Sequence, residues 1–323
     1  MRTDTPQGPG SPPAGGVIHD LGYQRYDGPR LGRSQIVTAL AWHSFRAAFG
    51  LGRGAKAKIV PVIAFLALCL PAIVNAFVMS KGNPRAVDYD TYVPALRDII
   101  MTIFVAVQAP ELVSRDLRSR VLPLYFSRPI KPGDYPLAKY LGFTAACLVM
   151  LEVPLLLLWG GAVANVHGGA AVWAQTRALF PGLLIGLMWA VGLAAISLLL
   201  ASLSGRRGFA TGAVAISLLL TYTLAEILLQ VETVAVIHAG PAGGPVGALG
   251  APPGPSLAEK VSGLFSPFTL FDGVRMWLGG DSHRVDNVSA PGSFGAVYAL
   301  VLLILFGLCL YGLAARYRKA RLS

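Results

Sequence analysis

Charged residues are scarce in this sequence: Asp, Glu, Lys and Arg together make up only 13% of its 323 residues, whereas soluble domains carry about 25%. Hydrophobic residues account for 54%, and the mean hydropathy is +0.59. This balance excludes an ordinary soluble domain and indicates a polytopic membrane protein. The net charge of +11 does not indicate a nucleic-acid partner, because the basic residues flank apolar runs as topological signals do.

The sequence also lacks the motifs of common catalytic and metal sites. Its three cysteines, Cys69, Cys147 and Cys309, all fall inside apolar runs, which favours neither a disulfide framework nor a metal site. The five histidines are scattered, and neither an H-E-x-x-H nor a G-x-S-x-G motif occurs. Residues 50–56 ("GLGRGAK") superficially resemble a phosphate-binding loop, but the second Gly before the Lys and the following Ser or Thr are missing. We therefore expect no cofactor and no enzymatic activity in this chain, so that any ATP-driven work requires a separate ATPase.

Long apolar runs are plentiful, and a membrane-spanning helix needs about 20 such residues. Five segments pass this test clearly: residues 59–79, 140–163, 178–203, 209–231 and 294–315. A sixth segment, residues 93–113, is weaker, because it includes Arg97, Asp98 and Glu111 and its uninterrupted apolar part covers only residues 99–107. Arg97 and Asp98 are expected at the outer membrane interface.

The distribution of Lys and Arg decides whether the weak segment crosses. With six spans and a cytoplasmic N-terminus, 20 of these residues lie inside and 6 outside, whereas five spans give 12 inside and 15 outside. The positive-inside rule therefore favours an all-α protein with six transmembrane helices and both termini in the cytoplasm. The first long apolar run begins near Ile59, so no signal peptide is expected.

The parts before and after the spans are basic. Residues 1–33 are rich in Gly, Pro and Arg and predict a disordered cytoplasmic segment, and residues 316–323 form a basic cytoplasmic tail. Residues 34–58 predict an interfacial amphipathic helix, with an ordinary juxtamembrane linker as the alternative. Its apolar face is formed by Val37, Ala41, Phe45 and Phe49.

One long outer loop, residues 232–292, separates the last two spans. Its first part is a Gly- and Pro-rich, low-complexity stretch. Its second part, "LFSPFTLFDGVRMWLGG", is too apolar for a free loop. We expect one or two short helices there, packed at the outer membrane surface.

The segment between the second and third spans, residues 114–139, is unusual. Its stretch "RDLRSRVLPLYFSRPIKPGDYPLAK" contains six Lys or Arg, two Asp and four Pro, and the positive-inside rule places it in the cytoplasm. An apolar run at residues 121–126 follows the charges. A helix that docks into a groove of a partner needs such an apolar face with a charged rim. The alternative, a simple topological anchor, explains the charge but not the apolar run.

This segment resembles the corresponding part of ABC-2 type permeases, the membrane subunits of ABC exporters. In that family a glutamate ends the second span, and a charged helix, an "L-x-S-R-P-I"-like segment and a Lys before the third span follow. Here Glu111, the charged helix from Arg115 to Arg120, the "SRPI" at residues 127–130 and Lys139 occupy those places. The chain departs from the family at residues 119–120, where Ser-Arg stands in place of the frequent Gly-Thr. The interfacial helix, the six spans and the apolar outer segment extend the resemblance over most of the chain.

The resemblance implies a permease subunit in a bacterial cytoplasmic membrane that exports an unidentified substrate. A P-loop ATPase would bind ATP and Mg and dock below, and a second copy or a sister permease would complete the pathway. The uniformly apolar spans favour a hydrophobic or amphiphilic substrate. The residues implied in ATPase docking are Glu111, Arg115, Asp116, Arg118, Arg120, Leu122, Tyr125, Phe126, Arg128 and Pro129.

Four further residues are candidates for function. Arg206 and Arg207, in the short second inner loop, either make a minor contact with the ATPase or simply fix a tight turn. Glu152 and Glu226 lie inside spans, where ionisable side chains are costly and face protein or water. They either line a pathway or dimer interface, or pair with polar neighbours.

Two other classes of function stay open. A secondary transporter would often show an internal repeat, and none is evident. A membrane scaffold or assembly protein without transport activity is also compatible with the composition.

Overall fold

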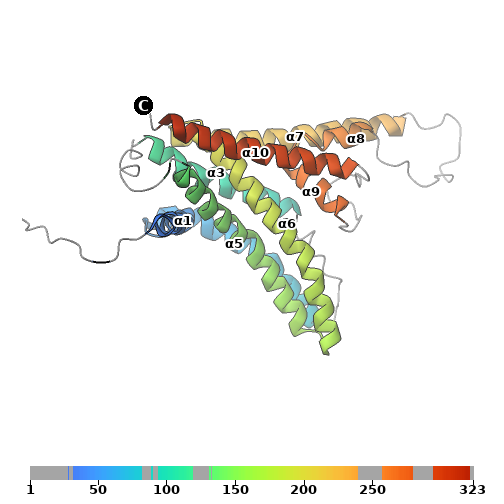
Figure 1. The fold of residues 1–323 in the computed structure, drawn as a ribbon. Helices are drawn as coiled ribbons and strands as arrows, with labels where there is room; N and C mark the ends of the chain where they lie inside the picture. Colours follow the sequence, from blue (N-terminus) through green and yellow to red (C-terminus); the bar gives the residue numbers. More distant parts are fainter. Residues whose placement is uncertain are drawn as a thin grey trace, which may run out of the picture. The chain divides into compact units, whose positions relative to one another are not determined.

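A computed structural model describes residues 28, 32–81, 89, 94–118, 131, 133–238, 257–278 and 294–320. The chain divides into two units, residues 1–32 and 33–323, and the description below concerns the second. All regular structure in these described ranges is helical (Figure 1), which confirms the predicted all-α class. The predicted disordered segment lies almost wholly outside the described residues, as does the middle of the predicted docking segment.

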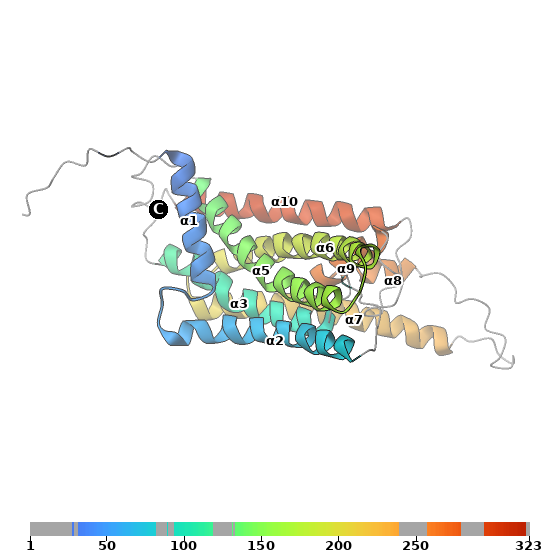
Figure 2. The same cartoon turned by 90° about the horizontal axis from the view of Figure 1, so that it is seen from below.

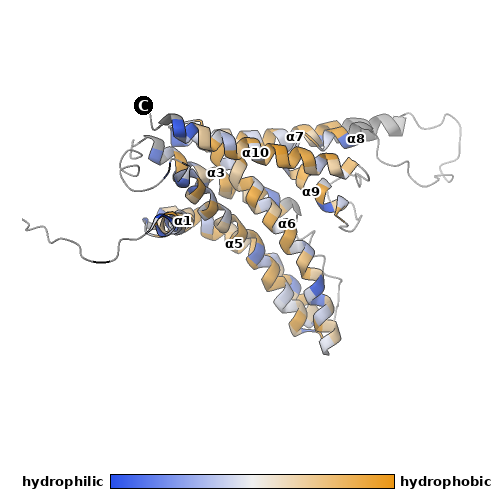
Figure 3. Cartoon of the chain, in the orientation of Figure 1, coloured by the Kyte–Doolittle hydropathy of each residue, from blue (hydrophilic) through white to orange (hydrophobic). Residues whose placement is uncertain are grey.

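Five of the helices are long and apolar enough to cross a membrane, as expected for a multi-pass membrane protein. Hydrophobic residues dominate their middle parts, and polar residues gather towards their ends (Figure 3). These helices are α2 (Ala55–Ser80), α5 (Asp134–Ala164), α6 (Gly169–Ser202), α7 (Arg207–His238) and α10 (Gly295–Ala320).

The weak apolar segment forms helix α3 (Pro94–Arg118), which packs against α2, α6 and α7. Six of its polar residues do not face outwards, because each of them is at most 9% exposed. A helix surrounded by other helices can carry such groups on its buried faces, so its low hydropathy reflects its interior position. The buried polar residues of α3 are Arg97, Asp98, Thr102, Gln108, Glu111 and Ser114.

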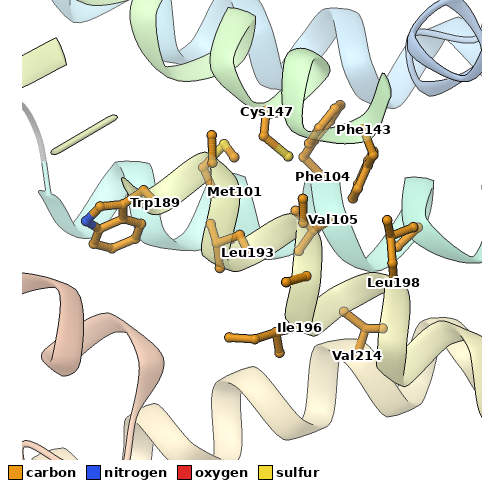
Figure 4. Close-up of a cluster of buried hydrophobic side chains, with 14 of the residues drawn as sticks. Met101, Phe104, Val105, Phe143, Cys147, Trp189, Leu193, Ile196, Leu198 and Val214 are labelled. Carbon is orange, nitrogen blue, oxygen red and sulfur yellow. The ribbon is translucent and has the colours of Figure 1, made fainter. Parts of the chain in front are cut away.

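Helices α5 and α6 form the centre of the packing. Over half of the apolar window of each is buried, 56% and 61%, whereas the figure is 22% for α2, 17% for α7 and 22% for α10. One hydrophobic core joins the helices, and its close-up shows Phe104 of α3 beside Phe143 of α5, with Leu193 of α6 in the same cluster (Figure 4). The outer faces of α2, α7 and α10 are therefore left for lipid or for other helices.

Helix α1 (Arg33–Ala48) runs across the ends of the other helices (Figure 2). It packs mainly against α5, and the contact is close: a Cβ atom on Gly142 would lie only 2.3 Å from the carbonyl oxygen of Ala41. The predicted apolar face of α1 is partly buried, as at Val37 and Phe45. The amphipathic helix thus packs on the bundle itself.

Two short helices, α8 (Leu257–Ser262) and α9 (Pro267–Trp277), follow in the region of the predicted outer helices. The Ser266 hydroxyl caps α9 by accepting a hydrogen bond from the N–H of Phe268. Most residues of α9 are buried among the other helices, and Phe271 packs on Trp189 of α6 with ring centroids 4.8 Å apart. Its apolar side chains therefore extend the core between α6 and α10.

The six long helices share one polar end, which we call the charged end. Side-chain contacts of Glu111 and Arg316 bring together the segment just before α2, the start of α7 and the last turns of α3, α6 and α10. Helix α5 begins there too, because Lys139 pairs with Asp116 of α3. Helices α2, α5 and α7 thus begin where α3, α6 and α10 end.

Candidate functional site at the charged end

Glu111 lies at the centre of the charged end. One of its carboxylate oxygens lies 2.7 Å from a guanidinium nitrogen of Arg53, and the other pairs with Arg207. The Glu111 side chain is 8% exposed, whereas that of Arg207 is 63% exposed. A single buried carboxylate of α3 therefore links the residues that precede α2 and begin α7.

Asp116, one turn and a half further along α3, joins that helix to α5. It accepts a hydrogen bond from the Tyr135 hydroxyl and lies 2.8 Å from the ammonium nitrogen of Lys139. Lys139 is buried, so this ion pair is shielded from water and screened little by salt. Helices α3 and α5 flank the middle of the predicted docking segment, and these contacts tie the end of α3 to the start of α5.

A second ion pair ties α1 to the start of α5. Arg33 donates two hydrogen bonds to Asp134, with Nε 2.6 Å from Oδ2 and Nη2 2.5 Å from Oδ1. This two-pronged geometry is the preferred one for a guanidinium and a carboxylate. The hydrogen bond with Asp134 raises the pKa of Arg33 above its ordinary value. Helix α1 is thereby attached where α5 begins.

Two contacts to backbone carbonyls hold the end of α6. The Ser114 hydroxyl donates to the carbonyl of Ala201 at 2.8 Å, and Nε of Arg316 donates to the carbonyl of Ser202 at 3.2 Å. The last carbonyls of a helix have no partners within it and carry partial negative charge, so these donors stabilise the terminus. The ends of α3, α6 and α10 are fixed together as a result.

The structure brings together some of the predicted docking residues. Glu111 meets Arg207, which was assigned to the second inner loop, while Arg206 is exposed beside it. Arg115 and Arg118 belong to the last turns of α3, which continues beyond the predicted span. The other predicted docking residues lie outside the described residues: Arg120, Leu122, Tyr125, Phe126, Arg128 and Pro129.

Sequence reasoning missed several partners of these residues. Arg33, Arg53 and Tyr135 meet acidic partners far away in the sequence, and no local pattern indicates such pairings. Asp134 offered a weak signal, because it follows a Pro-Gly turn at the start of a helix, where acidic residues are favoured.

Glu152 lies on α5 and Glu226 on α7. Glu152 lies so close to α6 that a Cβ atom on Gly186 would be 2.2 Å from its Oε1. Both of its carboxylate oxygens are buried without a hydrogen-bond partner among the described residues. Glu226 is half-buried on α7. Glu152 therefore faces the packed interior between α5 and α6.

Arg97 and Asp98, expected at the outer membrane interface, are buried near the start of α3, and Glu111 lies towards the other end of that helix. The guanidinium of Arg97 stacks on Trp189, 3.8 Å from the ring centroid. It also pairs with Asp98 at 3.0 Å and approaches Asp272 of α9 at 3.8 Å. The short helix α9 thus covers this part of α3, a contact that the sequence alone did not predict.

The described residues contain no group of three His, Cys, Asp or Glu side chains that could hold a metal ion. The charged end instead offers ion pairs that link helix ends, an arrangement suited to transmitting displacement between them. Comparison with models of known protein families and with curated proteins finds no match for this chain.

Proposed function

We propose that this chain is the membrane subunit of an ABC exporter, driven by a separate P-loop ATPase. The observation that carries the proposal is the pair of ties at the two ends of the basic segment 114–139. Asp116 near its start is bound to Tyr135 and Lys139 near its end, so a force applied to the segment acts on α3 and α5 together. That is the mechanical requirement for coupling ATP hydrolysis to movement of spans.

The proposal includes six spans rather than five. Helix α3 has 25 residues and reaches about 37 Å at 1.5 Å per residue, which exceeds the ~30 Å apolar core of a bilayer. Near its two ends it carries Arg97, which contacts Asp272 of α9, and Glu111, which contacts Arg53 just before α2. Together with the Lys and Arg distribution, this favours a cytoplasmic position for the charged end, in keeping with the expected cytoplasmic termini.

A second permease subunit, either another copy or a sister chain, belongs to the same proposal. The exposed apolar surface of α7 supports it, because Phe209, Ile216 and Leu220 are each more than 60% exposed. The proposed complex would lie in a bacterial cytoplasmic membrane. Its ATPase would bind ATP and Mg. The apolar spans favour a hydrophobic or amphiphilic substrate.

Affinity purification of the tagged chain from its native membranes tests this function. We expect an ATPase to co-purify, and we expect its binding to be lost when residues 119–132 are replaced by a Gly-Ser linker of equal length. Arg177→Gln serves as the control, because it removes an exposed basic residue of α6 that the proposal assigns to the outer side of the membrane. The proposal is wrong if no ATPase co-purifies and transport by the reconstituted chain follows an ion gradient alone, or if neither binding nor transport is found.

A further inference from the structure

We infer that a groove at the charged end binds the phosphate of an acidic phospholipid, with the acyl chains lying along α2. The groove has a volume of about 1020 Å³ and lies between the start of α2, the end of α3 and the turn between α6 and α7. This inference goes beyond the proposed transport function and does not depend on an ATPase.

Positive charge dominates the lining of the groove. Arg53, Lys56 and Arg207 line it, and Glu111 is the single acidic residue among its described lining residues. Each guanidinium has five N–H donors, so pairing with Glu111 leaves donors on both arginines. Lys56 is exposed and makes no ion pair within the described part of the chain. The surplus of positive charge matches a phosphate.

The start of α2 adds to this field. Gly54, its N-terminal capping residue, offers no side-chain acceptor to the first N–H groups of the helix. Unpaired N–H groups at a helix start favour a nearby anion. Their contribution is secondary to that of the three cationic side chains.

An apolar stripe on α2 continues from Lys56 and decides in favour of a lipid over a soluble anion. Ile59, Ile63, Leu66 and Leu70 follow Lys56 at helical spacing on one face. Their side chains are 52%, 61%, 60% and 61% exposed. A free phosphate would contact the cations alone, whereas a phospholipid matches the cations and the stripe together. Basic pockets between membrane helices bind anionic head groups in this way.

Binding of phosphatidylglycerol to the purified full-length chain tests the inference. The affinity would be measured in detergent by native mass spectrometry, with phosphatidylcholine and soluble glycerol phosphate as comparison ligands. We expect Lys56→Gln to weaken phosphatidylglycerol binding about fivefold, because each basic residue near a lipid surface contributes about 1 kcal/mol. Binding of phosphatidylcholine should stay unchanged.

Lys58→Gln is the matched control, since Lys58 is an exposed lysine in the same helical turn that does not line the groove. Equal weakening by both substitutions would show general surface attraction and overturn the site. Equal binding of glycerol phosphate would overturn the lipid assignment in favour of a free phosphate. An unchanged affinity for phosphatidylglycerol in Lys56→Gln would exclude the groove as a lipid site. The same conclusion would follow if Lys56→Gln abolished co-purification of a partner protein and left lipid binding unchanged. Lipid binding needs no partner chain, so its failure is distinguishable from failure of the transport proposal.

Discussion

Replacement of Glu111 by Gln should destabilise the packing of the six long helices, because one carboxylate holds the residues that precede α2 and begin α7. At 2.7 Å between Glu111 and Arg53, the gross attraction is about 6 kcal/mol for an effective dielectric constant of ~20. Loss of the hydration of Glu111 offsets most of this attraction. Arg207 is 63% exposed and is rehydrated when the carboxylate charge is removed. We therefore expect a net loss of about 2 kcal/mol, within the range for hydrogen bonds to charged groups.

Unfolding of the purified chain in mixed micelles, followed by circular dichroism as the denaturing detergent is titrated, measures this loss. Arg206→Gln is the control, because Arg206 is an exposed neighbour of Arg207 and its replacement should change the free energy of unfolding by less than about 0.5 kcal/mol. A double-mutant cycle of Glu111→Gln with Arg53→Gln should give a coupling energy of about 1 kcal/mol or more. If Glu111→Gln unfolds like the parent chain, or the coupling energy is zero, the ion pair does not hold these helices and the reasoning fails.

Two further substitutions probe the packing of α5. Gly142→Val should separate α1 from α5 and lower the free energy of unfolding by about 1–3 kcal/mol, because its Cβ would meet the Ala41 carbonyl at 2.3 Å. Gly160→Ala is the control and should be tolerated, because there is open space around Gly160. Equal free energies of unfolding for the two variants would contradict the close contact. Glu152→Gln should leave the free energy of unfolding unchanged or raise it, because the carboxylate is buried beside Gly186 without a hydrogen-bond partner in the described structure. A marked loss of stability in this variant would show that the carboxylate has a stabilising partner, whereas a loss of transport by the intact fold would assign it to the pathway.

How well hydropathy identified a membrane-spanning helix depended on where that helix packs. Helix α2 presents an apolar surface on almost every side, with only 22% of its apolar window buried, so composition alone identified it. Helix α3 carries buried polar residues such as Thr102 and Gln108, and the same measure undervalued it. The Lys and Arg distribution favoured α3 as a span because topology depends on the loops rather than on the helix itself.

The candidate site was only partly predictable, because its ion pairs depend on how the helices pack. Glu111 and Asp116 were chosen because they lie beside a basic, Pro-rich segment, a local pattern. Their partners Arg53 and Lys139 come from other helices, and pairings over such sequence distances depend on how the helices pack. The burial of Arg97 was likewise missed, because it requires the later helix α9 to cover it.

The sequence by itself determined the all-helical class, the membrane character and the position of five apolar helices, because these depend on composition and on the length of each run. It also identified the basic segment between α3 and α5, because charge and proline content are local properties. Only the tertiary structure decided that α3 lies inside the packing, that α9 enters the core and that Glu111 and Asp116 tie helix ends together. These features depend on contacts between residues far apart in the chain, which no local pattern specifies.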